Sequence, residues 1–194
     1  MTEELPYQVI RKFEHFEVRL YPEHIVAQVN IESSFEDAGN RAFRFLFAYI
    51  AGENRTNQKV AMTAPVVQDV ASMKIEMTAP VLQQEVSDPA TDIGSESYRV
   101  AFVLPEGFTL ENAPWPTNPR VVLRVVPEST AAVIRFSGRW SAQSYERHLT
   151  TLRSAMKEAG FSSLGAPRFA RFDPPMKPWF MRHNEIMINM ESSV

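Results

Sequence analysis

The sequence of 194 residues contains no cysteine. This absence excludes disulfides, thiolate metal ligands and cysteine nucleophiles together, and it is compatible with a reducing cytoplasm. The sequence also lacks an apolar stretch long enough to span a bilayer. Its N-terminus has neither the basic nor the apolar segment of a secretion signal. We therefore expect a cytoplasmic protein that has no membrane partner.

The sequence also lacks an excess of positive charge. The chain has 20 Lys and Arg residues against 23 Asp and Glu residues, which gives a net charge of −3. No run of basic residues would follow a phosphate backbone, so we expect no nucleic acid as a partner. The sequence also lacks a glycine-rich phosphate loop, a Gly-x-Ser-x-Gly elbow and a His-Glu-x-x-His motif. No enzyme class is indicated by a motif, and the protein is more readily interpreted as a binding protein.

Apolar residues make up 44% of the chain and charged residues 22%, an ordinary balance for one globular domain. The clearest predicted element is a helix. Ser33 and Glu36 form a capping-box pattern that opens it. The helix continues to about Ala51 and ends at Gly52. Its main apolar stripe consists of Phe35, Ala38, Ala42, Phe45, Leu46 and Tyr49.

This helix carries more apolar surface than one packed face requires. A second stripe contains Phe43, Phe47 and Ile50, and the arginines Arg41 and Arg44 lie among these residues. A surface helix normally has a single apolar stripe. The second stripe indicates either packing against another sheet or subunit, or a wall for an apolar ligand.

The pattern of this first helix recurs later in the chain. A strand at 25–31 precedes it, and a strand at 131–136 precedes a second helix that starts at Ser141 and ends near Gly160. Two strands follow each helix, so we expect an α+β fold of two pseudo-repeated β-α-β-β halves, about 7–104 and 120–190, with a cleft at their junction. The other strands are predicted at 7–13, 16–21, 59–67, 73–83, 98–104, 121–126, 168–172 and 185–190.

A shorter repeat lies between the halves. The sequence Ala-Met-Thr-Ala-Pro-Val at 61–66 recurs at 76–81 as Glu-Met-Thr-Ala-Pro-Val, offset by 15 residues. Proline donates no backbone hydrogen bond, so each copy predicts an edge strand or a bulge.

Several spaced motifs together resemble the SOUL heme-binding protein family, over about 7–190. They are Tyr-Ile-Ala-Gly-Glu-Asn at 49–54, Val-Ala-Met-Thr-Ala-Pro-Val at 60–66, Phe-Ser-Gly at 136–138, Phe-Asp-Pro-Pro at 172–175 and Arg-His-Asn-Glu-Ile at 182–186. The doubled Met-Thr-Ala-Pro-Val resembles bacterial members. The resemblance implies one domain over the whole chain, a distorted antiparallel β-barrel flanked by two long helices, and non-covalent binding of heme or another tetrapyrrole.

In this family the ligand is placed along the first long helix. A porphyrin requires an apolar wall for its ring and cations for its propionates. One branch of the family has a histidine as iron ligand at the position of Leu20, so that ligand is absent here and His24 is the nearest substitute in the sequence. The ligand-binding candidates are Arg41, Phe43, Arg44, Phe47, Ile50 and Lys177.

Three functional hypotheses follow from these observations. The first is a monomeric carrier or buffer for heme or another tetrapyrrole. The second is a module that binds another small hydrophobic ligand in the cleft between the halves, since the duplication also resembles the effector-binding domains of bacterial transcription regulators. The third is a hydrolase that uses a carboxylate in the cleft. Glu76, Glu185 and Tyr98 are the first residues to examine for this hypothesis.

Overall fold

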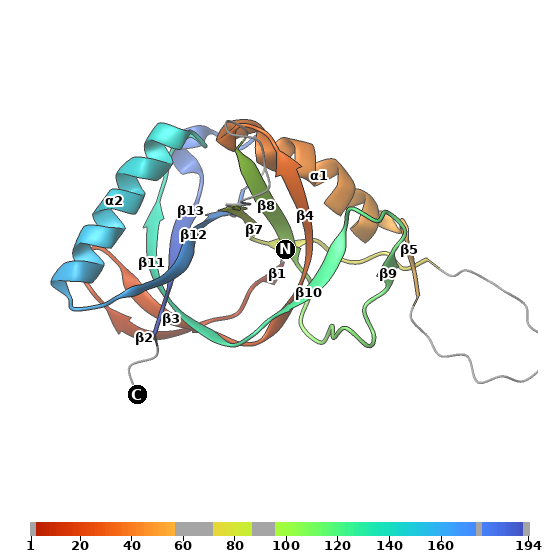
Figure 1. Cartoon of the computed structure of the whole chain (residues 1–194), viewed down its shortest axis with the longest axis horizontal. Helices are drawn as coiled ribbons and strands as arrows, with labels where there is room; N and C mark the ends of the chain where they lie inside the picture. Colours follow the sequence, from red (N-terminus) through yellow and green to blue (C-terminus); the bar gives the residue numbers. More distant parts are fainter. Residues whose placement is uncertain (1–2, 57–71, 87–95, 174–175, 192–194) are drawn as a thin grey trace, which may run out of the picture.

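The computed structural model describes residues 3–56, 72–86, 96–173 and 176–191. Nine strands form one curved sheet, and both long helices lie on its convex side (Figure 1). The helices are α1 (Phe35–Ala51) and α2 (Ala142–Glu158). The strands are β1 (Glu3–Glu4), β2 (Gln8–Lys12), β3 (Glu17–Tyr21), β4 (His24–Glu32), β5 (Asn54–Arg55), β6 (Thr78–Ala79), β7 (Val81–Glu85), β8 (Ser97–Val103), β9 (Trp115–Pro116), β10 (Val122–Val126), β11 (Ser129–Phe136), β12 (Ser163–Arg171) and β13 (Asn184–Met190).

The order of strands in the sheet has an internal symmetry. It is β10-β4-β8-β7-β12-β13-β11-β3-β2, and neighbouring strands are antiparallel throughout. The succession β4, α1, β7, β8 corresponds to the succession β11, α2, β12, β13. The six central strands therefore read β4-β8-β7 and then, in mirrored order, β12-β13-β11. The pairing of β7 with β12 is the line where the two units meet.

The first helix begins one residue later than the capping-box pattern predicts. Ser34, not Ser33, is the N-cap, and its hydroxyl accepts a hydrogen bond from the backbone N–H of Asp37 at 3.3 Å. The helix ends at Gly52, whose φ of 121° suits glycine. The second helix has Ser141 as its N-cap, as predicted.

Two apolar clusters lie on opposite faces of the sheet, because successive strand residues face opposite sides. The larger cluster packs between the helices and the sheet, and the smaller one covers the inner, concave face. On β12, Phe169 belongs to the helix-side cluster and Ala170 to the inner one. This alternation turns Arg171 toward the helices and Arg168 toward the concave face.

The mixed α+β class is confirmed, but closure into a barrel is not. In the described part of the chain β10 and β2 are the two edges of the sheet and do not pair with each other. The first copy of the short repeat lies outside the described residues. In the second copy, Thr78 and Ala79 form β6, which among the described strands pairs only with β1 and is therefore an edge strand, and Pro80 lies between β6 and the central strand β7. No described helix is long and apolar enough to cross a membrane.

Candidate functional site

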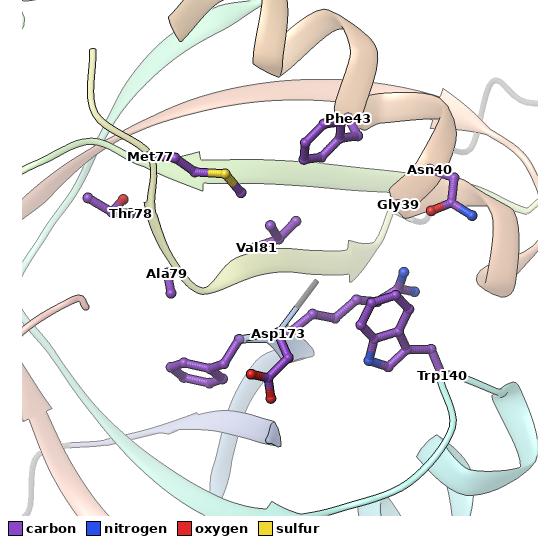
Figure 2. A pocket seen from close by; sticks show the side chains of 11 residues that line it. Gly39, Asn40, Phe43, Met77, Thr78, Ala79, Val81, Trp140 and Asp173 are labelled. Atoms are coloured by element: carbon purple, nitrogen blue, oxygen red, sulfur yellow. The ribbon is translucent and has the colours of Figure 1, made fainter. Parts of the chain in front are cut away.

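A cavity lies where the two units meet, between α1 and the end of β12. Its volume is about 260 Å³. One wall comes from α1, a second from the residues around the β6–β7 turn, and a third from the end of β12 and the segment that precedes α2 (Figure 2). We call it the helix-side cavity. Its apolar lining includes Phe43, Met77, Val81, Trp140 and Phe172.

Phe43 and Phe47 form an exposed aromatic pair on α1. They are four residues apart and share one helix face, and their rings stack with centroids 5.4 Å apart. The two residues are 39% and 47% exposed, although phenylalanine is usually buried. Phe43 also contacts Phe102 of β8 edge-on, with centroids 5.6 Å apart. Because Phe43 lines the cavity (Figure 2), the pair extends the apolar wall onto the surface.

Arg171 brings a buried positive charge to this apolar cavity. It is 6% exposed. Its Nη2 donates to Oε1 of Gln83 at 2.8 Å and to the carbonyl of Phe35 at 3.4 Å. Its Nε has no hydrogen-bond partner, and no carboxylate of the described residues forms an ion pair with it. Burial lowers the pKa of Arg171 to about 10, so the side chain remains charged at neutral pH.

Aromatic rings surround the Arg171 guanidinium. Its central carbon lies 5.0 Å from the ring centroid of Trp140 and 5.2 Å from that of Phe169. Such cation–π contacts offset part of the cost of desolvation. They do not replace a counter-ion, and an unpaired buried charge remains costly. The cavity therefore combines an apolar lining with a cation suited to an anionic group.

The rim of the cavity carries an ion pair. Nζ of Lys177 lies 2.7 Å from Oδ1 of Asp173, and the backbone N–H of His183 donates to Oδ2 of Asp173 at 2.5 Å. Burial alone would raise the pKa of Asp173, but these hydrogen bonds outweigh it and hold the pKa below its usual value. Asp173 lines the cavity, so Lys177 lies next to its mouth.

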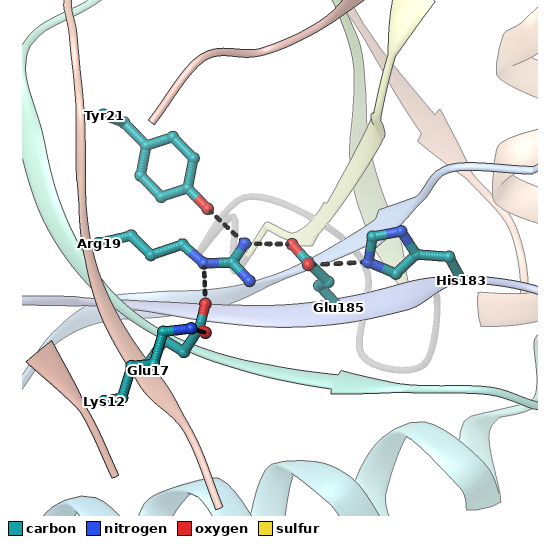
Figure 3. A network of polar contacts seen from close by, with 6 residues as sticks. All are labelled: Lys12, Glu17, Arg19, Tyr21, His183 and Glu185. Carbon is teal, nitrogen blue, oxygen red and sulfur yellow. Dashed lines mark hydrogen bonds and ion pairs between the residues drawn. The ribbon is translucent and has the colours of Figure 1, made fainter. Parts of the chain in front are cut away.

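A polar network joins Arg19, Glu185 and His183 (Figure 3). The buried Glu185 accepts from Nη1 of Arg19 at 3.0 Å, and its other carboxylate oxygen lies 2.8 Å from Nε2 of His183. Arg19 also donates to the hydroxyl of Tyr21 at 3.3 Å. The His183 ring stacks on Phe172 with centroids 4.0 Å apart. The network thereby positions one wall of the cavity.

The other predicted helix residues lie outside the cavity lining. Nη1 of Arg41 donates to the carbonyl of Glu32 at 3.4 Å, and the guanidinium of Arg44 lies 4.6 Å from the ring centroid of Phe45. Both arginines are exposed. Ile50 is buried in the helix-side core, so it supports the helix and does not reach the surface.

His24 also lies apart from the helix-side cavity. It is buried beside Leu5 and Val103 in a different cavity. Its Nδ1 lies 2.8 Å from the carbonyl oxygen of Pro22, and its Nε2 has no partner. Burial lowers its pKa, which favours the neutral ring. In the described residues no three His, Cys, Asp or Glu side chains form a group that would hold a metal ion.

The three candidates for a hydrolase are not brought together. Glu76 is exposed, and the hydroxyl of the buried Tyr98 donates to Oε2 of Glu96 at 2.8 Å. Glu185 is engaged by Arg19 and His183. None of the three lines the helix-side cavity.

The sequence analysis missed Arg171 and Trp140. Arg171 follows Phe169 at the spacing of two that places both on one face of a strand. A charged residue on the face that packs against the helices is the signal that would have identified it. Trp140 precedes the second helix and gives no comparable signal.

Solved structures of two proteins share this fold along nearly the whole chain. The C-terminal domain of EcmrR is 13% identical with a TM-score of 0.61, and the alignment covers 95% of this chain and 98% of that domain. A hydrolase from Listeria innocua is 12% identical with a TM-score of 0.60, and 98% of this chain and 100% of that chain are covered. At such identities the likeness shows the fold alone.

No curated protein matches the sequence significantly. A family model, in contrast, matches residues 2–189, nearly the whole chain, and its description is "SOUL heme-binding protein". The motifs at 49–54, 172–175 and 182–186 all lie within this match. The chain belongs to the SOUL heme-binding protein family.

Proposed function

We propose that the protein is a carrier or buffer that binds heme or another tetrapyrrole reversibly at the mouth of the helix-side cavity. The observation that carries the proposal is the stacked, exposed pair of Phe43 and Phe47, which extends the cavity wall onto the surface. A flat macrocycle requires such a wall. Family membership supports the choice of ligand.

The size and lining of the cavity suit one edge of a tetrapyrrole. Its volume of about 260 Å³ lies below the range of about 300–1,000 Å³ that is usual for ligand pockets. An edge with one propionate would enter, and the rest of the ring would lie against Phe47 outside. Inside, the guanidinium of Arg171 lines the cavity without an ion-pair partner among the described residues, and it marks a place for a carboxylate.

The remaining cations would assist at the surface. Arg41 and Arg44 are exposed on the same helix, where they attract an anionic ligand. Lys177 would reach a second propionate only by exchanging its contact with Asp173. No histidine belongs to the described lining of the cavity, whereas Met77 does. We therefore propose weak protein ligation of the iron, with Met77 in place of His24.

The test is a heme titration followed by absorbance. We expect saturable one-to-one binding by the wild type, weakened about tenfold or more in Phe43→Ala/Phe47→Ala, because two aromatic side chains that cover the ring are lost. Ile10→Ala removes an apolar side chain that is even more exposed, at 55%, from the edge strand β2, and it should leave binding unchanged. Equal or unsaturable binding by all three proteins would contradict the proposal.

A second candidate is a smaller apolar anion that fits wholly inside the cavity. The buried Arg171 among mostly apolar lining residues favours it. An aromatic monocarboxylate would then bind saturably while heme would not. In that case Phe43→Ala would weaken binding, and Phe47→Ala, which lies outside the lining, would not.

A further inference from the structure

Arg99, Gln84 and Arg168 form a row across three neighbouring strands on the concave face of the sheet. Gln84 of β7 is the register partner of Arg99 on β8 and of Arg168 on β12. Residues two positions away on the same strands, Leu82 and Ala101, belong to the apolar cluster of the concave face. Because successive side chains of a strand point to opposite faces of the sheet, residues two positions apart share a face. The row therefore points to the concave face, as Leu82 and Ala101 do.

This row borders a second cavity, which we call the inner cavity. Its volume is about 260 Å³. Arg124 of β10 also lines it, and Gln28 and Asn189 are further polar residues of the lining. No Asp or Glu belongs to the described lining, although the chain has a net charge of −3. Three arginines therefore border one small space that holds no carboxylate.

The hydrogen-bonding capacity of these arginines is largely unused. The buried Nε of Arg99 has no partner. Nη2 of Arg168 donates to Oδ1 of Asn189 at 2.5 Å. Burial lowers the pKa of Arg168, which shows that its charge is partly desolvated. None of the three arginines forms an ion pair with a described residue, so each is available to pair with an anion.

We propose that the inner cavity binds a phosphoryl group, as free phosphate or as a small organic phosphate ester. A phosphoryl group carries a charge of about −1.5 to −2 and three acceptor oxygens at neutral pH. Several guanidinium groups can share these oxygens, whereas a carboxylate is satisfied by one arginine. The amide of Gln28 supplies a further donor, and Leu82 and Ala101 form an apolar base for an organic part. The amide of Gln84 already donates one N–H to the carbonyl of Ala166 at 2.9 Å and keeps its second N–H.

The inner cavity is independent of the proposed tetrapyrrole site. Arg168 and Arg171 lie on the same strand but face opposite sides of the sheet, so the sheet separates the two cavities. A phosphate bound to Arg168 would leave the helix-side cavity unchanged. Failure of one proposal would therefore leave the other standing.

The test is calorimetric titration of the whole protein at low ionic strength with inorganic phosphate, pyrophosphate and glucose 6-phosphate. We expect saturable one-to-one binding of at least one probe. Tighter binding of inorganic phosphate would identify free phosphate as the ligand class, and tighter binding of glucose 6-phosphate would identify an organic phosphate ester. Removal of one charge-assisted contact in Arg168→Gln or Arg99→Gln should weaken binding about tenfold or more. Added salt should weaken it as well.

Two further variants keep the test decisive. Arg124→Gln alters an exposed arginine of the inner cavity, so it should fold normally and still weaken binding. Arg147→Gln alters an exposed arginine of α2, on the other side of the sheet, and should bind as the wild type does. The proposal is wrong if no probe binds saturably, or if Arg124→Gln and Arg147→Gln bind equally well. Heme titration of the same variants should give unchanged results.

Discussion

A Cβ atom on Gly39 would lie 2.5 Å from Nη1 of Arg171. The first helix therefore approaches the end of β12 so closely that a methyl group at this position would displace the guanidinium. The helix itself does not require glycine here, because no residue within it has a positive φ. Gly39 is instead explained by the buried cation that it accommodates.

Gly39→Ala should consequently destabilise the protein. Alanine in a helix interior normally stabilises by about 0.5–1 kcal/mol relative to glycine, but here the added methyl group would displace Arg171. We therefore expect Gly39→Ala to lower the free energy of unfolding measured in urea. In the Arg171→Gln background the same substitution should lower it less or raise it. Asn40→Ala, at the exposed neighbouring position, serves as the control. Stabilisation by Gly39→Ala alone would contradict the close approach.

Arg19→Met should destabilise the protein strongly. It leaves the carboxylate of Glu185, which is 1% exposed, without its guanidinium partner. Removal of one member of a buried ion pair typically costs about 3–5 kcal/mol. Lys12→Gln, which breaks an exposed pair with Glu17, should cost no more than about 1 kcal/mol. Chemical unfolding measures both changes, and similar small effects would show that Glu185 is not held as described.

The stability of the protein should fall as the pH falls below the ordinary pKa of histidine, which is about 6.5. Burial lowers the pKa of His24 in the folded state. In this window the unfolded chain binds a proton that the folded protein does not, so acid favours unfolding. The free energy of unfolding, measured in urea, should therefore decrease between about pH 7 and pH 5, and His24→Asn should make this decrease smaller. His15→Asn, at an exposed position, should leave the pH dependence of the free energy of unfolding unchanged. The same pH dependence in His24→Asn as in the wild type would contradict the buried neutral ring.

The periodic parts of the fold were predictable from the sequence. The two Ser-capped helices, their ends close to Gly52 and Gly160, and the duplicated order of helix and strands depend on local patterns. The structure shifts only details, with Ser34 as the first N-cap and Ala159 as the second C-cap. Barrel closure could not be predicted in this way. Whether the edge strands β10 and β2 meet depends on the curvature of the whole sheet and not on a local pattern.

The site was only partly predictable for a related reason. The surplus apolar stripe identified Phe43 and Phe47, because exposed phenylalanine on a helix is visible in the periodicity. The same stripe also suggested Ile50, which the core buries, since a helical wheel does not show where the sheet ends. Arg171 required knowledge of which face of β12 meets the helices, and that depends on register set by distant strands.

The most direct test compares the binding of heme with that of heme dimethyl ester, whose carboxylates are blocked, to the wild type and to Arg171→Gln. The wild type should bind heme at least about tenfold more tightly than the ester, because only the free acid pairs with the buried guanidinium. Arg171→Gln should lose most of this preference, because only the surface cations Arg41, Arg44 and Lys177 remain to attract the free acid, and circular dichroism should confirm that it is folded. Equal binding of acid and ester by the wild type, or an unchanged preference in Arg171→Gln, would contradict a carboxylate site at Arg171.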